Sequence, residues 1–164
     1  MSIDYNSPEF IARLKAKALE IGINEISSSD LEPGKNRDYF IEWLGEGFHG
    51  DLDYMHKHGE KRYHPDQLVP GTVSMLTAQL HYYNPDIDAA ARLEDPNHAY
   101  VAEYALGRDY HKALRNMLTN LGKWLQTEIP DLEFRAFVDS APVLERAFSQ
   151  KAGLGFFGKN TMII

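Results

Sequence analysis

Apolar residues recur at helical spacing in long stretches of the chain, and each stretch is bounded by residues that start or stop helices. The first follows Ser7-Pro8, a capping hydroxyl with a proline at the first turn, and stops at Gly22. A second carries its aromatic residues on one face before Gly45. The longest runs from Asp109 to Pro130, with Leu and Met at i, i+3, i+4 and i+7 spacing. We therefore expect three amphipathic helices.

Shorter segments rich in β-branched and aromatic residues predict strands. The expected strands are a long buried one over Thr72 to Tyr83, an alternating one over Phe134 to Val138, and others over Ile23 to Ser28, Tyr100 to Ala105 and the apolar C-terminal residues. Ser140 is expected to cap a helix from Ala141 to Ala152, and the polar segment Asn84 to His98 should hold at most a short helical piece.

The alternation of helices and strands indicates an α/β class, more closely an α+β layered sheet with flanking helices. A length of 164 residues is enough for one domain with its own core, so we expect one domain over residues 1–164. The apolar residues at the end enter a strand, and a domain seldom stops inside one. We therefore expect a truncated domain.

Composition narrows the chemistry. The chain has no cysteine, which excludes disulfides, thiolate nucleophiles and Cys-ligated zinc or iron–sulfur sites within these residues. The net charge of −7 does not indicate a nucleic-acid surface. No apolar run reaches the roughly 20 residues that span a bilayer, and the first residues lack the pattern of a signal peptide. We expect a cytoplasmic protein that does not contact a membrane.

Three short segments could carry chemistry. Asp139 ends an expected strand, where a carboxylate is placed to act as an acid or base, although Asp139 and Ser140 could simply cap the next helix. The segment Gly107 to His111 could hold an anion or an oxygenated substrate, or Asp109 could merely cap its helix. Gly153 to Thr161 has glycines that permit close approach of a bulky ligand, but its spacing is not that of a P-loop.

The segment from Glu46 to Asp66 is rich in histidine, yet it matches no metal-ligand spacing. His49, His56, His58 and His64 are expected to lie in a flexible solvated loop with a short helix around Leu52 to Lys57, so no metal site is predicted. Arg62 in this segment precedes the long strand and could reach the edge of a ligand. The pair Tyr82-Tyr83 fits the core or the rim better than a stacking platform.

Taken together, these segments resemble the N-terminal part of the epoxyqueuosine reductases, cobalamin-dependent enzymes of the last step of queuosine synthesis in tRNA. The resemblance spans nearly the whole chain, and its last block is the most specific. The matching segments are Gly50 to Met55, Arg62 with Pro65 and Leu68 to Gly71, Gly107 to His111, and Phe137 to Lys151 continuing through Gly153 to Thr161.

The resemblance implies a fold similar to the nitroreductase-like cobalamin-binding domain of reductive dehalogenases. It implies that Asp139 is the proton donor and that Tyr110 and His111 line the substrate pocket. The implied cobalamin-binding residues are Arg62, Asp139, Gly158, Lys159, Asn160 and Thr161.

The partners that the resemblance implies are a tRNA carrying epoxyqueuosine and an external electron donor, with the protein acting as a monomer. In the family a ferredoxin-like domain with two 4Fe–4S clusters follows, and then a helical-repeat domain that supplies much of the tRNA contact. This chain ends before any cluster cysteine. Turnover therefore needs those downstream parts, and a non-catalytic corrinoid-binding or trafficking module is the alternative function.

Overall fold

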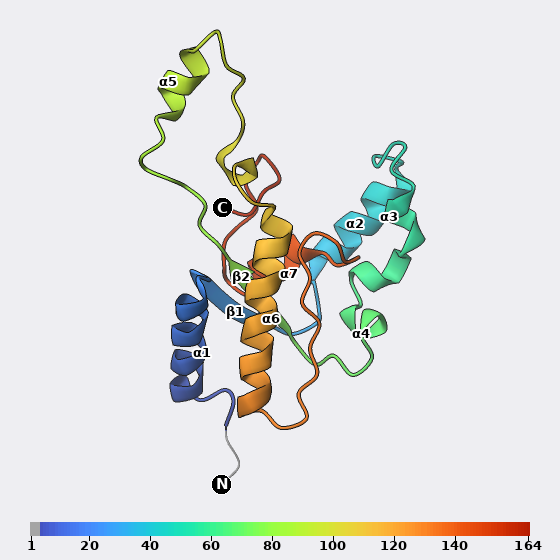
Figure 1. Cartoon of the computed structure of the whole chain (residues 1–164). Helices are drawn as coiled ribbons and strands as arrows, with labels where there is room; N and C mark the ends of the chain where they lie inside the picture. The colour runs from blue at the N-terminus through green and yellow to red at the C-terminus, as the bar shows by residue number, and fades with distance from the viewer. Residues whose placement is uncertain (1–3) are drawn as a thin grey trace. The chain divides into compact units, whose positions relative to one another are not determined.

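The computed structural model describes residues 4–164 (Figure 1). The chain forms two compact units. One unit comprises the chain up to Gln79 together with Asp139–Ile164, and the other comprises Leu80–Val138. The first unit is therefore assembled from two segments that are far apart in the sequence.

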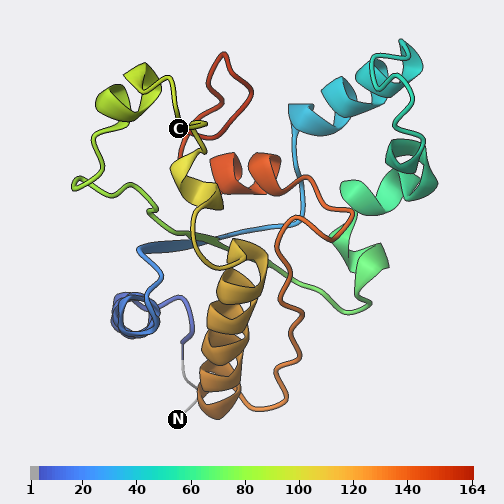
Figure 2. The same cartoon turned by 45° about the horizontal axis from the view of Figure 1, so that its top comes forward.

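A pair of antiparallel strands organises the first unit. β1 (Glu25–Ser29) pairs with β2 (Met75–Gln79) in a register that sets Ile26 opposite Ala78. Helices α1 (Pro8–Ile21) and α7 (Glu145–Lys151) both contact the strands, and the view of Figure 2 shows them on either side of the pair. The core thus forms where the two helices cover the strands.

The core of the first unit is apolar, and α1, the first helix of this unit, has a clear signal at each end. Ile23 and Phe148 are fully buried, as are most of Phe10 and Ala147. The Ser7 hydroxyl accepts a hydrogen bond from the Phe10 amide at 3.3 Å. Gly22 closes α1 with φ of 100°, a left-handed conformation that glycine adopts without steric cost. The sequence signals for this helix are confirmed.

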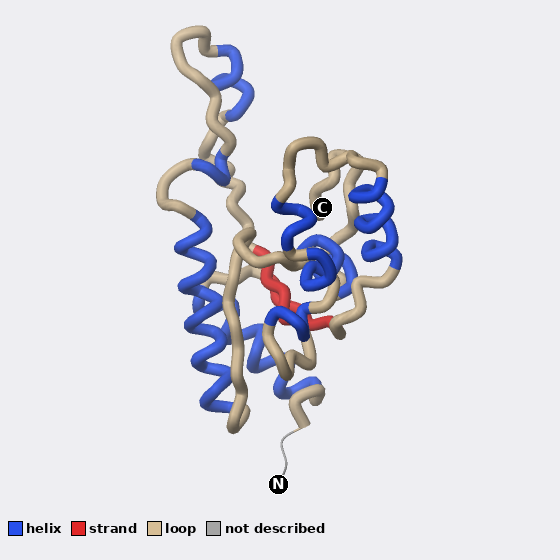
Figure 3. Tube along the Cα trace, turned by 90° about the vertical axis from the view of Figure 1, so that its right-hand side faces the viewer, coloured by secondary structure: helices blue, strands red, loops and turns tan. Residues whose placement is uncertain are grey.

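Short helices connect β1 to β2. They are α2 (Lys35–Gly45), α3 (Tyr54–Lys57), the 3-10 helix η1 (Gly59–Arg62) and α4 (Pro65–Leu68). The segment around the histidines is thus folded into short helices, among them α2, α3 and α4 in Figure 1, and the tube in Figure 3 draws the paired strands in red. The expected helix near Leu52 to Lys57 is present as α3.

The second unit consists of helices and irregular backbone. Its helices are α5 (Ala89–Glu94), the 3-10 helix η2 (Glu103–Ala105) and α6 (Tyr110–Glu128). The Asp109 carboxylate caps α6 by accepting a hydrogen bond from the His111 amide at 3.0 Å, and Leu121 and Leu125 are buried. The predicted long helix with its Asp109 cap is therefore confirmed.

The mixed class of helices and strands is confirmed, but several predicted strands are wrong. The strand predicted over Thr72 to Tyr83 is limited to β2, and Tyr100 to Ala105 holds a 3-10 turn instead of a strand. Phe134 to Val138 has no assigned secondary structure, and the end of the chain contributes one isolated bridge between Phe157 and Ile163. A strand needs a neighbouring backbone to pair with, and the described residues form a sheet of only two strands.

The helix predicted from Ala141 to Ala152 begins four residues late. Pro142 disfavours the helical conformation at Ala141, and the Leu144 amide donates to the Arg62 carbonyl at 2.9 Å instead of joining a helical turn. α7 therefore starts at Glu145 and has no side-chain cap. The predicted capping role of Ser140 is wrong.

Candidate functional site

The start of α7 is the point where three separate candidate segments of the first unit meet. The Leu144 amide donates to the Arg62 carbonyl at 2.9 Å, and the Asp139 amide donates to Glu145 Oε1 at 3.1 Å. The Arg146 guanidinium donates to the Thr161 carbonyl. Three consecutive residues thus join segments that the sequence analysis singled out one by one.

The Arg62 guanidinium binds backbone carbonyls of the short helix that precedes it in the chain. Its Nε donates to the Met55 carbonyl at 3.3 Å and its Nη2 donates to the Tyr54 carbonyl at 3.2 Å. The guanidinium carbon also lies 5.9 Å from the centre of the Phe40 ring, within cation–π range. Burial lowers the pKa of Arg62, which still leaves an arginine charged at neutral pH. These contacts hold the turn between α3 and α4, and a contact of Arg62 with a ligand stays a prediction.

Asp139 occupies an exposed loop in an unusual backbone conformation. Its φ of 56° lies in the left-handed region, which a residue with a Cβ seldom adopts, although aspartate does so more readily than most. Ala141 and Val143 are buried after it, so the loop is anchored to the core on that side. Asp139 is therefore exposed to solvent, while the residues that follow it hold the loop against the core.

Glu145 makes a direct contact with this loop through the hydrogen bond from the Asp139 amide. Its carboxyl group is largely removed from solvent, and this burial, together with the nearby charge of Asp139, raises the pKa of Glu145 to about 7. The hydrogen bond from the Asp139 amide opposes the rise by stabilising the carboxylate. Two carboxyl groups thus lie close together, and one of them is poised to change charge near neutral pH.

The turn Gly158 to Thr161 lies at the tip of a small hairpin. The Phe156 and Ile164 backbones exchange two hydrogen bonds of 3.0 Å, and the Thr161 amide donates to the Gly158 carbonyl at 3.0 Å. Lys159, Asn160 and Thr161 are exposed on this turn. The turn can therefore offer an ammonium, an amide and a hydroxyl group to a ligand.

The packing of the hairpin itself requires glycine at two positions of this segment. A Cβ at Gly155 would lie 2.6 Å from the Ile164 carbonyl oxygen, and one at Gly158 would lie 2.4 Å from the Ile164 side chain. Gly153 has φ of 77°, which a side chain would strain. These glycines let the chain fold back on itself. The close approach of a bulky ligand to these glycines stays a prediction.

Tyr110 and His111 lie in the second unit, at the first turn of α6. The two rings stack with centroids 4.0 Å apart, and His111 Nδ1 lies 2.8 Å from an Asp109 carboxylate oxygen. This hydrogen bond lowers the pKa of Asp109. Tyr104 makes edge contacts with both Tyr110 and Tyr82. The structure therefore extends the predicted pair into a row of aromatic rings, which Tyr82 joins with 64% of its surface exposed.

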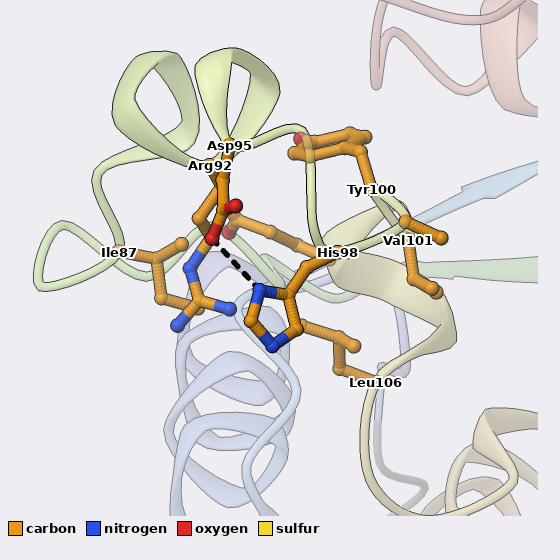
Figure 4. A pocket seen from close by; sticks show the side chains of 9 residues that line it. Ile87, Arg92, Asp95, His98, Tyr100, Val101 and Leu106 are labelled. Atoms are coloured by element: carbon orange, nitrogen blue, oxygen red, sulfur yellow. Dashed lines mark hydrogen bonds and ion pairs between the residues drawn. The ribbon is translucent and has the colours of Figure 1, made fainter.

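The second unit also contains a pocket that the sequence analysis did not predict (Figure 4). It encloses about 450 Å³ and carries both signs of charge, with His98 Nδ1 2.7 Å from the Asp95 carboxylate. Its lining residues are Ile87, Arg92, Asp95, His98, Ala99, Tyr100, Val101, Glu103 and Leu106. Only the run of charged and aromatic residues in this polar segment could have indicated it.

The described residues offer neither a metal-ligand cluster nor a membrane-spanning helix. Within residues 4–164, no three His, Cys, Asp or Glu side chains are grouped so that they could hold a metal ion. His49 and His56 do meet, with Nε2 atoms 2.9 Å apart. No helix in the same part of the chain is long and apolar enough to cross a membrane.

The structure thus brings together the segments of Arg62, Asp139 and Thr161, whereas Tyr110 and His111 belong to the other unit. Glu145 and Arg146 make two of the three connections and were not singled out from the sequence. An acidic residue in the first turn of a helix is a common helix-starting signal, so the pattern alone gave no reason to separate Glu145 from others.

Comparison with known proteins gives one consistent result. Residues 62–140 match the family model described as "Epoxyqueuosine reductase QueG, DUF1730". The chain is 42% identical over its whole length to the epoxyqueuosine reductase of Aliivibrio fischeri, covering 44% of that protein. It is 45% identical to that of Pseudomonas aeruginosa, where 98% of this chain covers 46% of the relative. The chain therefore spans less than half the length of these curated relatives.

Solved structures agree with the sequence comparison. A selenomethionine-labelled epoxyqueuosine reductase matches with a TM-score of 0.77 at 26% identity, over 94% of this chain and 41% of the other. An epoxyqueuosine reductase with an epoxyqueuosine-modified tRNA-Tyr stem loop matches with a TM-score of 0.76 at 25% identity, over the same shares. The Bacillus subtilis enzyme, with its catalytic aspartate loop swung out of the active site, matches with a TM-score of 0.73 at 25% identity, again over 94% and 41%.

Proposed function

Because the chain is homologous along its whole length to part of the epoxyqueuosine reductases, we propose that it is the cofactor- and substrate-binding part of such an enzyme. The reaction is the reduction of epoxyqueuosine in tRNA to queuosine, and it uses cobalamin. One observation carries the proposal beyond the homology. The segments that the resemblance assigns to the cofactor and to the acid, those of Arg62, Asp139 and Thr161, meet at the start of α7.

The reaction balances as a two-electron reduction. The epoxide takes up two electrons and two protons, both carbon–oxygen bonds of the three-membered ring break, and the products are an alkene and water. Cobalamin, when bound, supplies the electrons. The protein then has to hold the substrate, exclude water and deliver protons to the departing oxygen.

Asp139 is the residue that delivers a proton in this proposal. The oxygen that leaves the ring is strongly basic, so a proton given to it as the bond breaks lowers the barrier. Asp139 lies on a loop and is exposed to solvent, where a substrate can reach it. An apolar ligand that covers a carboxyl group favours its neutral form, which is the form that can donate.

The exposed apolar residues of the hairpin at the end of the chain support the proposal that it binds a corrin. Phe156 and Met162 flank the polar turn and are 60% and 59% exposed, so an apolar ligand would remove much of their surface from water. Lys159, Asn160 and Thr161 would meet the polar groups at the rim of such a ligand, and Gly158 keeps the turn tight. Tyr110 and His111 would contact the substrate.

The remaining parts of the proposal concern the longer polypeptide. Two 4Fe–4S clusters would lie in a downstream ferredoxin-like domain and receive electrons from an external donor. Downstream helical repeats would supply most of the tRNA contact, and the protein would act in the cytoplasm as a monomer, with the nitroreductase-like fold that reductive dehalogenases use for cobalamin. The relative that was solved with a modified tRNA stem loop supports tRNA as the substrate.

The coding frame beyond Ile164 gives the first test. A frame that continues with two Cys-x2-Cys-x2-Cys-x3-Cys-Pro runs supports the reductase, because this spacing ligates two such clusters. A frame without them favours the corrinoid-binding or trafficking module instead.

The second test is Asp139→Asn in the full-length polypeptide, assayed anaerobically with an epoxyqueuosine-modified tRNA stem loop. Loss of general acid catalysis should lower the rate of queuosine formation by about 100-fold or more. Cobalamin binding, followed by absorbance, should change little. Asp131→Asn is the matched control, since Asp131 also has a left-handed φ, of 61°, on an exposed turn. Unchanged turnover in the Asp139 variant would exclude the acid role.

A further inference from the structure

The contact between Glu145 and the loop of Asp139 has no role in the function proposed so far. We propose that Glu145 is a positioning residue, which holds the backbone at Asp139 and thereby fixes where the carboxyl group of Asp139 lies. The inference rests on the proposed function, because it assigns Glu145 a part in presenting the acid. The observation behind the inference is a hydrogen bond of 3.1 Å, which the Asp139 amide donates to Glu145 Oε1.

The acceptor in this bond is fixed by the core. Glu145 is the first residue of α7. Ala147 and Phe148, which follow it on the same helix, are 3% and 0% exposed. The Ser149 hydroxyl donates to the Glu145 carbonyl at 2.8 Å. The preceding residue, Leu144, is tied through its amide to the Arg62 carbonyl. The carboxyl group of Glu145 therefore extends from a backbone that is held on both sides.

The donor in this bond needs support. A left-handed φ is unfavourable for a residue with a Cβ, and such conformations persist where surrounding contacts define them. Asp139, at φ of 56°, lies on an exposed loop, and the bond to Glu145 binds its own backbone amide. Removing the acceptor would take away one of the contacts that hold the loop, so the loop would relax more readily towards more favourable backbone conformations. The carboxyl group of Asp139 would then lose its fixed position.

Two substitutions at Glu145 can separate its role as a hydrogen-bond acceptor from its role as an ionisable group. A glutamine at position 145 keeps an oxygen that can accept the same bond and removes the ionisable group, whereas an alanine removes both. Burial and the charge of Asp139 already favour the neutral form of Glu145, so the site tolerates a neutral acceptor. If Glu145 holds the loop, glutamine should preserve its function and alanine should not.

The test compares Glu145→Gln with Glu145→Ala in the full-length polypeptide. Hydrogen–deuterium exchange at the Asp139 amide should be about tenfold faster in the alanine variant and nearly unchanged in the glutamine variant, since the bond being lost is to a carboxyl group. The kcat for queuosine formation should fall about tenfold in the alanine variant, while the KM for the tRNA stem loop stays the same. Glu20→Ala is the control, because Glu20 is an exposed helical glutamate whose carboxylate pairs with Lys17.

Each outcome decides the inference. Rescue of both exchange and kcat by glutamine supports it. Unchanged exchange at Asp139 in the alanine variant overturns it, as does a glutamine variant with exchange as fast as that of alanine. If the alanine variant does not fold, Glu145→Asp, which withdraws the carboxyl group by one methylene, takes its place in the comparison. A wild-type enzyme that forms no queuosine would refute the proposed function, and the exchange experiment would still decide whether Glu145 holds the loop.

Discussion

The raised pKa of Glu145 predicts how the stability of the protein depends on pH. The perturbation is Glu145→Gln, which removes the ionisable group and keeps a similar shape and an acceptor oxygen. Wild type and variant share every other titrating group. The difference between their free energies of unfolding therefore isolates the ionisation of Glu145, and the charged group that faces it in the structure is Asp139.

The magnitude follows from the two pKa values. The pKa of Glu145 is about 7 in the folded protein against an ordinary value of 4.5, so the folded state binds an extra proton between these values. The resulting stability is fully present below pH 4.5 and is lost as the pH rises through about 7. At about 1.4 kcal/mol for each pH unit, the loss approaches about 3 kcal/mol, and water at the exposed part of the carboxyl group makes this an upper figure.

The assay is urea unfolding of both proteins at pH 4.5, 6 and 8, followed by tryptophan fluorescence. The variant should gain stability relative to wild type as the pH rises, and most of the gain should appear between pH 4.5 and 7. The slopes of the urea transitions should agree, which confirms that the two unfolding reactions are the same. A stability difference that stays constant over this range would refute the reasoning, because Glu145 would then ionise as it does in the unfolded chain.

Other predictions follow from the packing and the helix ends. Phe148→Ala should cost about 3–5 kcal/mol in urea unfolding, because Phe148 is fully buried, whereas Phe156→Ala at a 60% exposed position should cost far less. Equal losses would contradict the assigned core. Ser7→Ala should cost about 1 kcal/mol through the lost bond to the Phe10 amide, and it should lower the thermal midpoint of the far-UV circular dichroism signal. Gly153→Ala should cost about 1–2 kcal/mol by urea unfolding, since its φ of 77° strains a side chain and no atom within 4 Å offers new contacts; a neutral result would mean that the turn relaxes freely.

The two long helices show what local sequence can predict. Ser7 and Gly22 bound α1, and Asp109 caps α6, through contacts that span only a few residues. These signals act within one turn of the helix. They predict the same end wherever the helix is placed in the fold.

The strands and α7 show where local sequence is insufficient. The alternation from Phe134 to Val138 resembles a strand, but a strand exists only where another backbone pairs with it, and the described residues offer none there. The start of α7 depends on the bond between the Leu144 amide and the Arg62 carbonyl, which joins residues about 80 positions apart. No pattern within the segment reports that contact.

For the candidate site too, some features follow from the sequence and others only from the tertiary structure. The sequence by itself determined the residue types that could carry chemistry, Asp139 and the polar turn at Asn160 among them, because chemistry depends on functional groups. Only the tertiary structure decided that these segments meet at the start of α7, and that Glu145 contacts the loop of Asp139. The physical reason is that burial, hydrogen bonding and the pKa of Glu145 all depend on which distant segments the fold brings into contact.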